Sequence, residues 1–234
     1  MKEAGKRYKA IAEKVTHERT YSPEEAIAHI KDTATAKFDE TVDVAIRLGV
    51  DAKSGEQMVR GTVTLPHGTG KSPRVLVFAR GEQASAAEAA GADEVGAEEL
   101  VQKLEAGFKD FDVLVATRDM MRLVGRLGKR LGPRMPSPKA GTVGEDVAAI
   151  VRDLKSGRVQ FRMDKGGVIH APVGKASFTP EQLQENFTTL MNAVVRARPS
   201  AAKGQYLRKI AMSATMGPSV IIDPGQAQSL GESL

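Results

Sequence analysis

The chain has 234 residues, 41% of them apolar, which is enough to bury one large core or two ordinary ones. It has no cysteine, which excludes a disulfide framework and a cysteine-bound zinc site, and its four histidines lack metal-ligand spacing. The net charge of +5 permits an anionic partner, and no apolar run approaches the ~18 residues of a membrane span. We therefore expect a cytoplasmic protein with no membrane contact, metal or cofactor.

The first 67 residues are predicted to mix helices and strands. Residues 1–19 combine cations with apolar residues at helical spacing and indicate a short helix or an ordered arm. Ser22-Pro23-Glu24-Glu25 is a capping box with proline at the first helical position, which predicts a helix to about residue 33. Alternating apolar residues predict strands over 42–48 and 59–65, joined as a hairpin through a turn at 53–55.

The middle of the chain has a different character. After the Pro- and Gly-rich residues 66–73, strands are predicted at 75–79, near 95 and at 113–116, with helices at 83–90, 98–104, 120–131 and 145–154. The first and third of these strands are apolar at every position. Such strands, separated by helices, are typical of a parallel sheet that is covered on both faces.

The last third of the chain again shows alternating apolar strands and a capping box, as the first third does. Strands are predicted near 159–163, 168–171, 206–212 and 220–222, and Thr179-Pro180-Glu181-Gln182 repeats the capping chemistry of Ser22–Glu25 before a helix that ends near 198. The polar tail from 223 to 234 is expected to be disordered. We therefore predict a discontinuous α+β outer domain, 1–67 plus 159–234, interrupted by an inserted α/β domain, 68–158.

Gly68-Thr69-Gly70-Lys71-Ser72 invites comparison with a nucleotide-binding loop. A P-loop needs glycine five positions before Gly70, where this chain has Leu65, and it follows a strand, whereas this segment precedes one. A plain interdomain turn is the favoured interpretation. The alternative function is a nucleotide-dependent enzyme that uses the α/β insert.

Cations are concentrated in one part of the insert. Residues 118–139 hold seven Lys or Arg against one acid, and part of this set falls at four-residue intervals on a predicted helix. The set is either a solubilising face or a secondary contact for RNA or tRNA phosphates. The candidate residues are Arg122, Arg126, Lys129, Arg130, Arg134 and Lys139.

Three polar stretches of the outer domain suggest a single RNA-binding face. Lys37 and Phe38 offer a cation beside an aromatic ring, although by composition alone Phe38 is more often a core residue. Residues 164–167 suit a hairpin turn, and residues 213–219 carry small donors, a thioether and open backbone. Each stretch alone is also an ordinary turn. Because the outer domain closes only when the chain ends pack together, we expect 215–217 to lie beside 37–38.

Several long motifs resemble one protein family. They are Thr35–Val42, Arg60–Gly68, Lys139–Gly144, Gly174–Phe178 and Thr215–Val220. Together they are similar to the family of the bacterial large-subunit ribosomal protein number one, the protein of the mobile stalk, over about residues 3–223. The loop from Arg134 to Lys139 is two residues shorter than the family pattern, so the resemblance transfers no contact to that loop.

The resemblance implies an outer α+β domain with an inserted Rossmann-like three-layer domain that has no dinucleotide activity. It also implies a non-catalytic protein that binds the stalk region of large-subunit rRNA, assists release of deacylated tRNA from the exit site and represses its own operon mRNA. No small-molecule substrate is implied. Matched by motif, the RNA-binding residues are Lys37, Phe38, Glu40, Thr41, Asp164, Lys165, Gly166, Ser213, Thr215, Met216 and Gly217.

Overall fold

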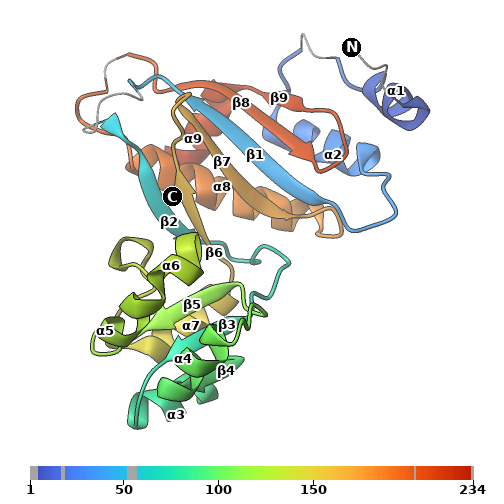
Figure 1. The fold of residues 1–234 in the computed structure, drawn as a ribbon. Helices are drawn as coiled ribbons and strands as arrows, with labels where there is room; N and C mark the ends of the chain where they lie inside the picture. Colours follow the sequence, from blue (N-terminus) through green and yellow to red (C-terminus); the bar gives the residue numbers. More distant parts are fainter. Residues whose placement is uncertain (1–4, 17–18, 52–56, 203, 233–234) are drawn as a thin grey trace. The chain divides into compact units, whose positions relative to one another are not determined.

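The computed structural model describes residues 5–16, 19–51, 57–202 and 204–232 (Figure 1). The chain forms two compact units, one from residues 1–70 and 159–234 and the other from residues 71–158. The sequence predicts outer segments of 1–67 and 159–234, and the two units of the structure meet at 70/71 and 158/159. The turn predicted at 53–55 lies outside the described residues.

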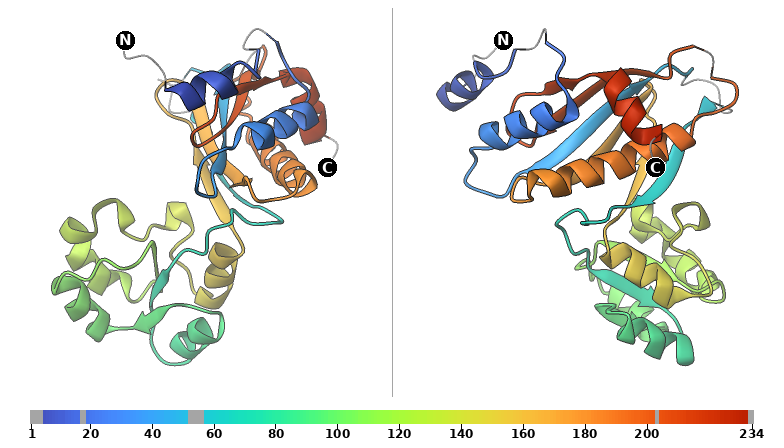
Figure 2. Two further views of the ribbon diagram at one scale, coloured as in Figure 1. Left: turned by 90° about the vertical axis from the view of Figure 1, so that its right-hand side faces the viewer. Right: turned by 180° about the vertical axis from the view of Figure 1, so that it is seen from behind.

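An antiparallel sheet forms the centre of the first unit, with strand order β7-β1-β8-β9. The strands are β1 (Thr41–Leu48), β7 (Val168–Lys175), β8 (Leu207–Ala214) and β9 (Val220–Ile222). Helices α2 (Pro23–Thr33), α8 (Pro180–Arg196) and α9 (Pro224–Glu232) lie on one side of this sheet (Figure 2, right). Helix α1 (Lys6–Ala12) precedes them in the chain.

Alternation along β1 separates the two faces of the sheet. Val42, Val44 and Ile46 are fully buried against the helices, whereas Asp43 and Arg47 are exposed. Both predicted capping boxes are confirmed, because Ser22 with Glu25 and Thr179 with Gln182 each make the reciprocal pair of hydrogen bonds.

The predicted hairpin between residues 42–48 and 59–65 is wrong. Strand β2 (Arg60–Thr64) pairs with β6 (Arg158–Arg162) in a separate two-stranded sheet. Strand β1 has β7 on one edge and β8 on the other, so it has no free edge for β2. The competing partners are more than 100 residues away in the sequence, and a local turn signal does not reveal them.

The predicted disorder of the C-terminal tail is also wrong for residues 224–232, which form α9. The Asp223 carboxylate accepts from the Gly225 amide at 2.8 Å, which supports the start of the helix. Ala227 and Gly231 are buried. A Cβ at Gly231 would lie 3.2 Å from the Met191 carbonyl carbon, so glycine allows α9 to pack closely on α8.

The second unit is built on a parallel sheet with strand order β4-β3-β5, which confirms the predicted parallel pairing. The strands are β3 (Val75–Phe78), β4 (Glu94–Gly96) and β5 (Val113–Ala116). Helices α3 (Glu82–Ala89) and α7 (Val147–Lys155) belong to one of its apolar cores, while α4 (Glu98–Glu105), α5 (Met121–Val124) and α6 (Gly128–Leu131) belong to the other.

One continuous helix over 120–131 does not form. Instead α5 passes through a short 3₁₀ segment, Gly125–Leu127, into α6, and a 3₁₀ turn at Gly132–Arg134 and another at Pro138–Ala140 follow. Gly125 and Gly128 lie at the two breaks, and glycine in a helix interior costs about 1 kcal/mol relative to alanine. No helix in the described part of the chain has the length and apolarity needed to cross a bilayer.

Candidate nucleic-acid interface

The two distant stretches, residues 36–41 and 213–217, lie side by side in the structure, and the contacts between them run through residues 40 and 41, next to the expected 37–38. Thr41 and Thr215 make three hydrogen bonds: Thr215 N to Thr41 O at 3.0 Å, Thr41 N to Thr215 Oγ1 at 3.0 Å, and Thr215 Oγ1 to Thr41 O at 3.2 Å. They continue the pairing of β1 with β8, in which Asp43 faces Ser213. We call the surface formed by residues 36–41 and 213–217 the two-loop surface.

Glu40 lies beneath the two-loop surface and connects its two halves. Its side chain is 1% exposed, and its two carboxylate oxygens accept from the Ala36 amide at 2.9 Å and the Met216 amide at 2.8 Å. A buried carboxylate is tolerated when it accepts charge-assisted hydrogen bonds of this kind. Glu40 therefore positions both loops and is not itself available to an RNA, which corrects its placement among the contacting side chains.

Large apolar side chains are exposed on this surface. Phe38 is 55% exposed and Met216 is 49% exposed, so Phe38 is not the core residue that composition favours. Lys37 is also exposed, while Gly217 is half-buried and its amide donates to the Ala214 carbonyl at 3.1 Å. The surface thus offers an aromatic ring, a thioether and a cation on a backbone held from below.

Two neighbouring segments support the two-loop surface with residues that are not among the predicted RNA-binding set. Lys175 Nζ donates to Thr41 Oγ1 at 2.9 Å, and Ser177 Oγ donates to the Asp39 carboxylate at 2.9 Å. From α1, Arg7 donates to Thr35 Oγ1 at 3.2 Å and to the Met216 carbonyl at 3.4 Å. The basic N-terminal segment was visible in the sequence, but its docking next to residue 216 was not.

The third stretch, Asp164–Gly167, does not join this cluster and lies at the other end of the sheet. It precedes β7, and the Gly167 carbonyl accepts from the Leu48 amide at 2.9 Å, at the end of β1 that is opposite Thr41. Thr41 and Leu48 are seven residue steps apart along β1, a distance of about 24 Å. The exposed face of the sheet runs between them and carries Arg47, His170 and Lys209.

The turn itself is held by the Asp164 carboxylate. Asp164 Oδ1 accepts from the Val168 amide at 2.9 Å and the Gly166 amide at 2.8 Å, and Gly167 has a φ of +77°. The amide of Val168, followed by that of Gly166, holds the pKa of Asp164 below its ordinary value. Lys165 and Gly166 are exposed at its tip.

The basic residues of the second unit fall into separate groups, because the helix expected to carry them is broken. Arg122 and Arg126 line a cavity of about 570 Å³. Arg130 and Arg134 line another, of about 480 Å³. Lys129 is exposed on α6 and is not among the lining residues of either cavity, and the side chain of Lys139 lies outside the described part of the structure.

Comparison with known proteins assigns the chain to a family. Residues 30–218 match the model of the ribosomal protein L1p/L10e family. The chain belongs to this family. Two relatives, both called large ribosomal subunit protein uL1, agree along nearly their whole length. That of Cutibacterium acnes (strain DSM 16379 / KPA171202) is 59% identical over 225 residues, which are 95% of this chain and 97% of the relative. That of Frankia alni (strain DSM 45986 / CECT 9034 / ACN14a) is 53% identical over 229 residues, which are 97% and 96%.

Membership of the L1p/L10e family makes the chain a structural protein and not an enzyme. The geometry of the Gly68–Ser72 segment is also unlike that of a nucleotide-binding loop. The buried side chain of Asn186 accepts from the His67 amide at 3.1 Å and donates to the Gly68 carbonyl at 3.0 Å. This segment leads into β3 with no helix between them, whereas a P-loop presents free amides at the start of a helix.

Proposed function

We propose that this protein of the L1p/L10e family is a structural rRNA-binding protein of the large-subunit stalk, working on the ribosome in the cytoplasm. The observation that carries the proposal is the two-loop surface. Its halves are 174 residues apart in the sequence, and the Thr41–Thr215 pair and the buried Glu40 carboxylate join them into one support. An exposed aromatic ring, an exposed thioether and a cation on a rigid backbone suit ribose and base faces of folded RNA.

The contact would extend along the uncovered face of the sheet to the Asp164–Gly167 turn. Arg47 and Lys209 pair across β1 and β8 on this face, and Lys165 stands at its far end. A length of about 24 Å suits a folded RNA element better than one or two nucleotides. In this scheme the contacts to riboses and bases come from Phe38, Thr215 and Met216. The contacts to phosphates come from Arg47, Lys165 and Lys209.

The two units would act as two domains, with the outer one bound to rRNA and the inserted one free to make a second contact. Only two chain crossings, at 70/71 and 158/159, join them. Arg122, Arg126 and Lys129 are exposed cations suited to the phosphates of tRNA leaving the exit site. An mRNA segment that reproduces the rRNA shape would occupy the same outer surface, and this would repress the operon that encodes the protein.

Titration of a stalk rRNA fragment at several salt concentrations tests the proposal. Thr215→Ala removes the hydroxyl between the two loops, so we expect weaker binding with an unchanged salt slope. Lys165→Ala removes one phosphate contact and is expected to reduce the slope by about one unit. Lys103→Ala, at a lysine that pairs with Glu94 in the other unit, is the control and should change neither. Unchanged affinity and slope in both test variants would remove these residues from the interface.

A further inference from the structure

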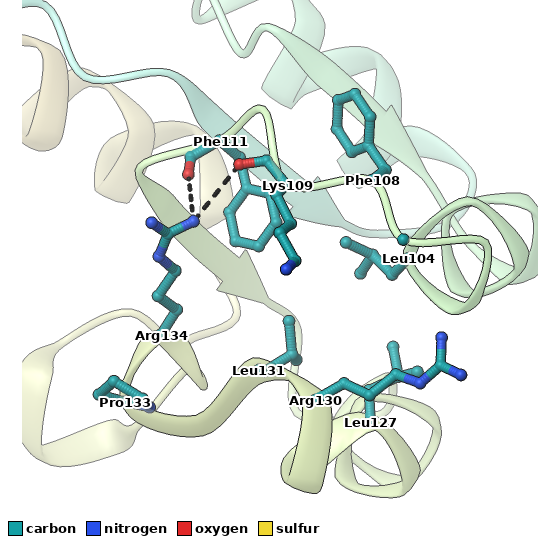
Figure 3. A pocket seen from close by; sticks show the side chains of 10 residues that line it. Leu104, Phe108, Lys109, Phe111, Leu127, Arg130, Leu131, Pro133 and Arg134 are labelled. Atoms are coloured by element: carbon teal, nitrogen blue, oxygen red, sulfur yellow. Dashed lines mark hydrogen bonds between the residues drawn. The ribbon is translucent and has the colours of Figure 1, made fainter.

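The cavity of about 480 Å³ in the second unit has an apolar floor (Figure 3). Leu104 comes from α4, Leu127 and Leu131 come from the segment that ends in α6, and Phe111 comes from the loop before β5. All four are at most 7% exposed. The Phe108 ring lies 6.5 Å from that of Phe111, so aromatic and aliphatic groups line the same hollow.

Three cations, Lys109, Arg130 and Arg134, also line this cavity, and the described residues around it include no acidic one in its lining. Arg134 Nη1 donates to the carbonyls of Lys109 at 3.3 Å and Phe111 at 3.2 Å (Figure 3), while Arg130 donates to the Glu105 carbonyl. In the described part of the chain, none of the three cations has a carboxylate within 4.0 Å. The carbonyls therefore fix both guanidinium groups in place without neutralising them.

The chemistry of the floor distinguishes two kinds of anionic ligand. A nucleobase buried there would need acceptors for its edge N–H donors, and the nearby carbonyls of Glu105, Lys109 and Phe111 each already accept from an arginine. Burying unpaired polar atoms costs free energy. Leucine or phenylalanine side chains carry no such atoms. The cavity therefore suits apolar side chains accompanied by carboxylates better than it suits a nucleotide.

We propose that this cavity is a docking site for an acidic segment of a partner protein. The segment inserts one or two large apolar side chains over Leu104, Leu127 and Leu131 and places carboxylates against the three cations. Apolar anchors ringed by charge pairs are typical of helix-in-groove recognition. This site belongs to the second unit and is independent of the two-loop surface proposed to bind rRNA.

The test uses the full chain with isotope-labelled leucine methyl groups and a fluorescent peptide. The peptide carries leucine and phenylalanine at helical spacing with glutamates between them. We expect the methyl signals of Leu104, Leu127 and Leu131 to shift saturably, and a peptide with alanine at both apolar positions not to bind. Absence of these methyl shifts, or equal binding of the alanine peptide, would overturn the proposal.

Charge-reversal variants separate docking from general attraction. Lys109→Glu and Arg130→Glu should each weaken peptide binding by about tenfold or more, because each places a like charge against a carboxylate. Lys129→Glu is the matched control: it reverses an exposed cation of the same helix outside the cavity lining and should stay within about twofold. Equal losses in all three variants would mean non-specific attraction and would refute the docking site.

A parallel titration with RNA decides whether the cavity binds a peptide or a nucleotide. A uridine oligonucleotide that shifted the same methyl groups at lower concentration than the peptide would assign the cavity to nucleotides and overturn the proposal. So would a loss of rRNA-fragment affinity in Arg130→Glu that equalled its loss of peptide affinity. Failure of the proposed rRNA function is measured separately, through Thr215 in the other unit.

Discussion

At the scale of single residues, the buried side chain of Glu40 holds the two-loop surface in place without being exposed on it. Each of its carboxylate oxygens accepts from the backbone of a different loop, and the residue is 1% exposed. Ala36 and Met216 are far apart in sequence, so the position of one loop relative to the other depends on this group. The geometry of Phe38 and Met216 is therefore fixed from below.

Glu40→Gln should break one of the two contacts and so loosen the connection between the loops. The amide keeps only one acceptor oxygen, and its NH₂ group would face a backbone N–H donor, so one buried donor loses its partner. We expect the free energy of unfolding to fall by about 1–3 kcal/mol and rRNA-fragment affinity to fall with it. Urea denaturation and RNA titration measure the two effects. Glu13→Gln, at an exposed position of the N-terminal segment, should change neither, and native stability in Glu40→Gln would contradict the positioning role.

Tyr206 provides a pH-dependent test of the outer core. Its hydroxyl donates to the buried Val194 carbonyl at 3.0 Å, and burial raises the pKa of Tyr206 to about 12, with nearby Arg198 opposing the shift. Because the folded-state pKa lies above the unfolded value, the stabilising contribution is complete below pH 10 and is lost as pH rises toward 12. Ultraviolet titration of the wild-type protein against Tyr206→Phe should show one tyrosine ionising near pH 12. A Tyr206 ionisation near pH 10 would show that the site is open to water.

At the scale of elements, local chemistry determines where helices begin and break, and packing against distant segments determines whether a helix such as α9 forms. The two capping boxes could be predicted because donor and acceptor lie three residues apart. The apolar strands of the second unit could be predicted because they are buried on both faces. The glycines at the helix break, Gly125 and Gly128, are visible in the sequence, whereas the formation of α9 depends on its packing against α8, which a local pattern does not contain.

The closeness of α8 and α9 can be tested at Gly231. A Cβ there would lie 3.2 Å from the Met191 carbonyl carbon and from Val195 Cγ2, both on a packed helix. Gly231→Val should therefore push α9 outward and lower the free energy of unfolding by about 1–3 kcal/mol, measured by urea denaturation. Gln226→Ala, at an exposed position of the same helix, is the control and should be neutral or slightly stabilising. Equal stability of the two variants would mean that α9 is not docked as described.

The same contrast between local and long-range information applies to the candidate site. The sequence identified residues 36–41 and 213–217 as neighbours because both flank strands of a domain closed by the two chain ends. It did not show that Phe38 would be exposed, that Glu40 would be buried, or that Asp164–Gly167 would lie at the other end of the sheet. These facts depend on the register of β1 with β7 and β8, which long-range packing sets.

At the scale of the whole molecule, the outer unit is closed by both chain ends. Tyr21 exchanges backbone hydrogen bonds with the C-terminal strand region, donating to Ile221 at 2.9 Å and accepting from Asp223 at 3.0 Å. Strand β1 lies between β7 and β8. The two-loop surface therefore requires that residues 207–222 have joined the sheet, and the RNA binding that we propose for it would require the complete outer unit.

The central claim is that the two-loop surface binds rRNA, and one pair of variants tests it most directly. Met216 and Met58 are both exposed methionines of the outer unit, 49% and 36% accessible, but only Met216 belongs to the surface. Equilibrium titration of a stalk rRNA fragment should show Met216→Ala weakened by about 1–3 kcal/mol and Met58→Ala within about twofold of the unmodified protein. Equal affinity of the two variants would contradict the claim.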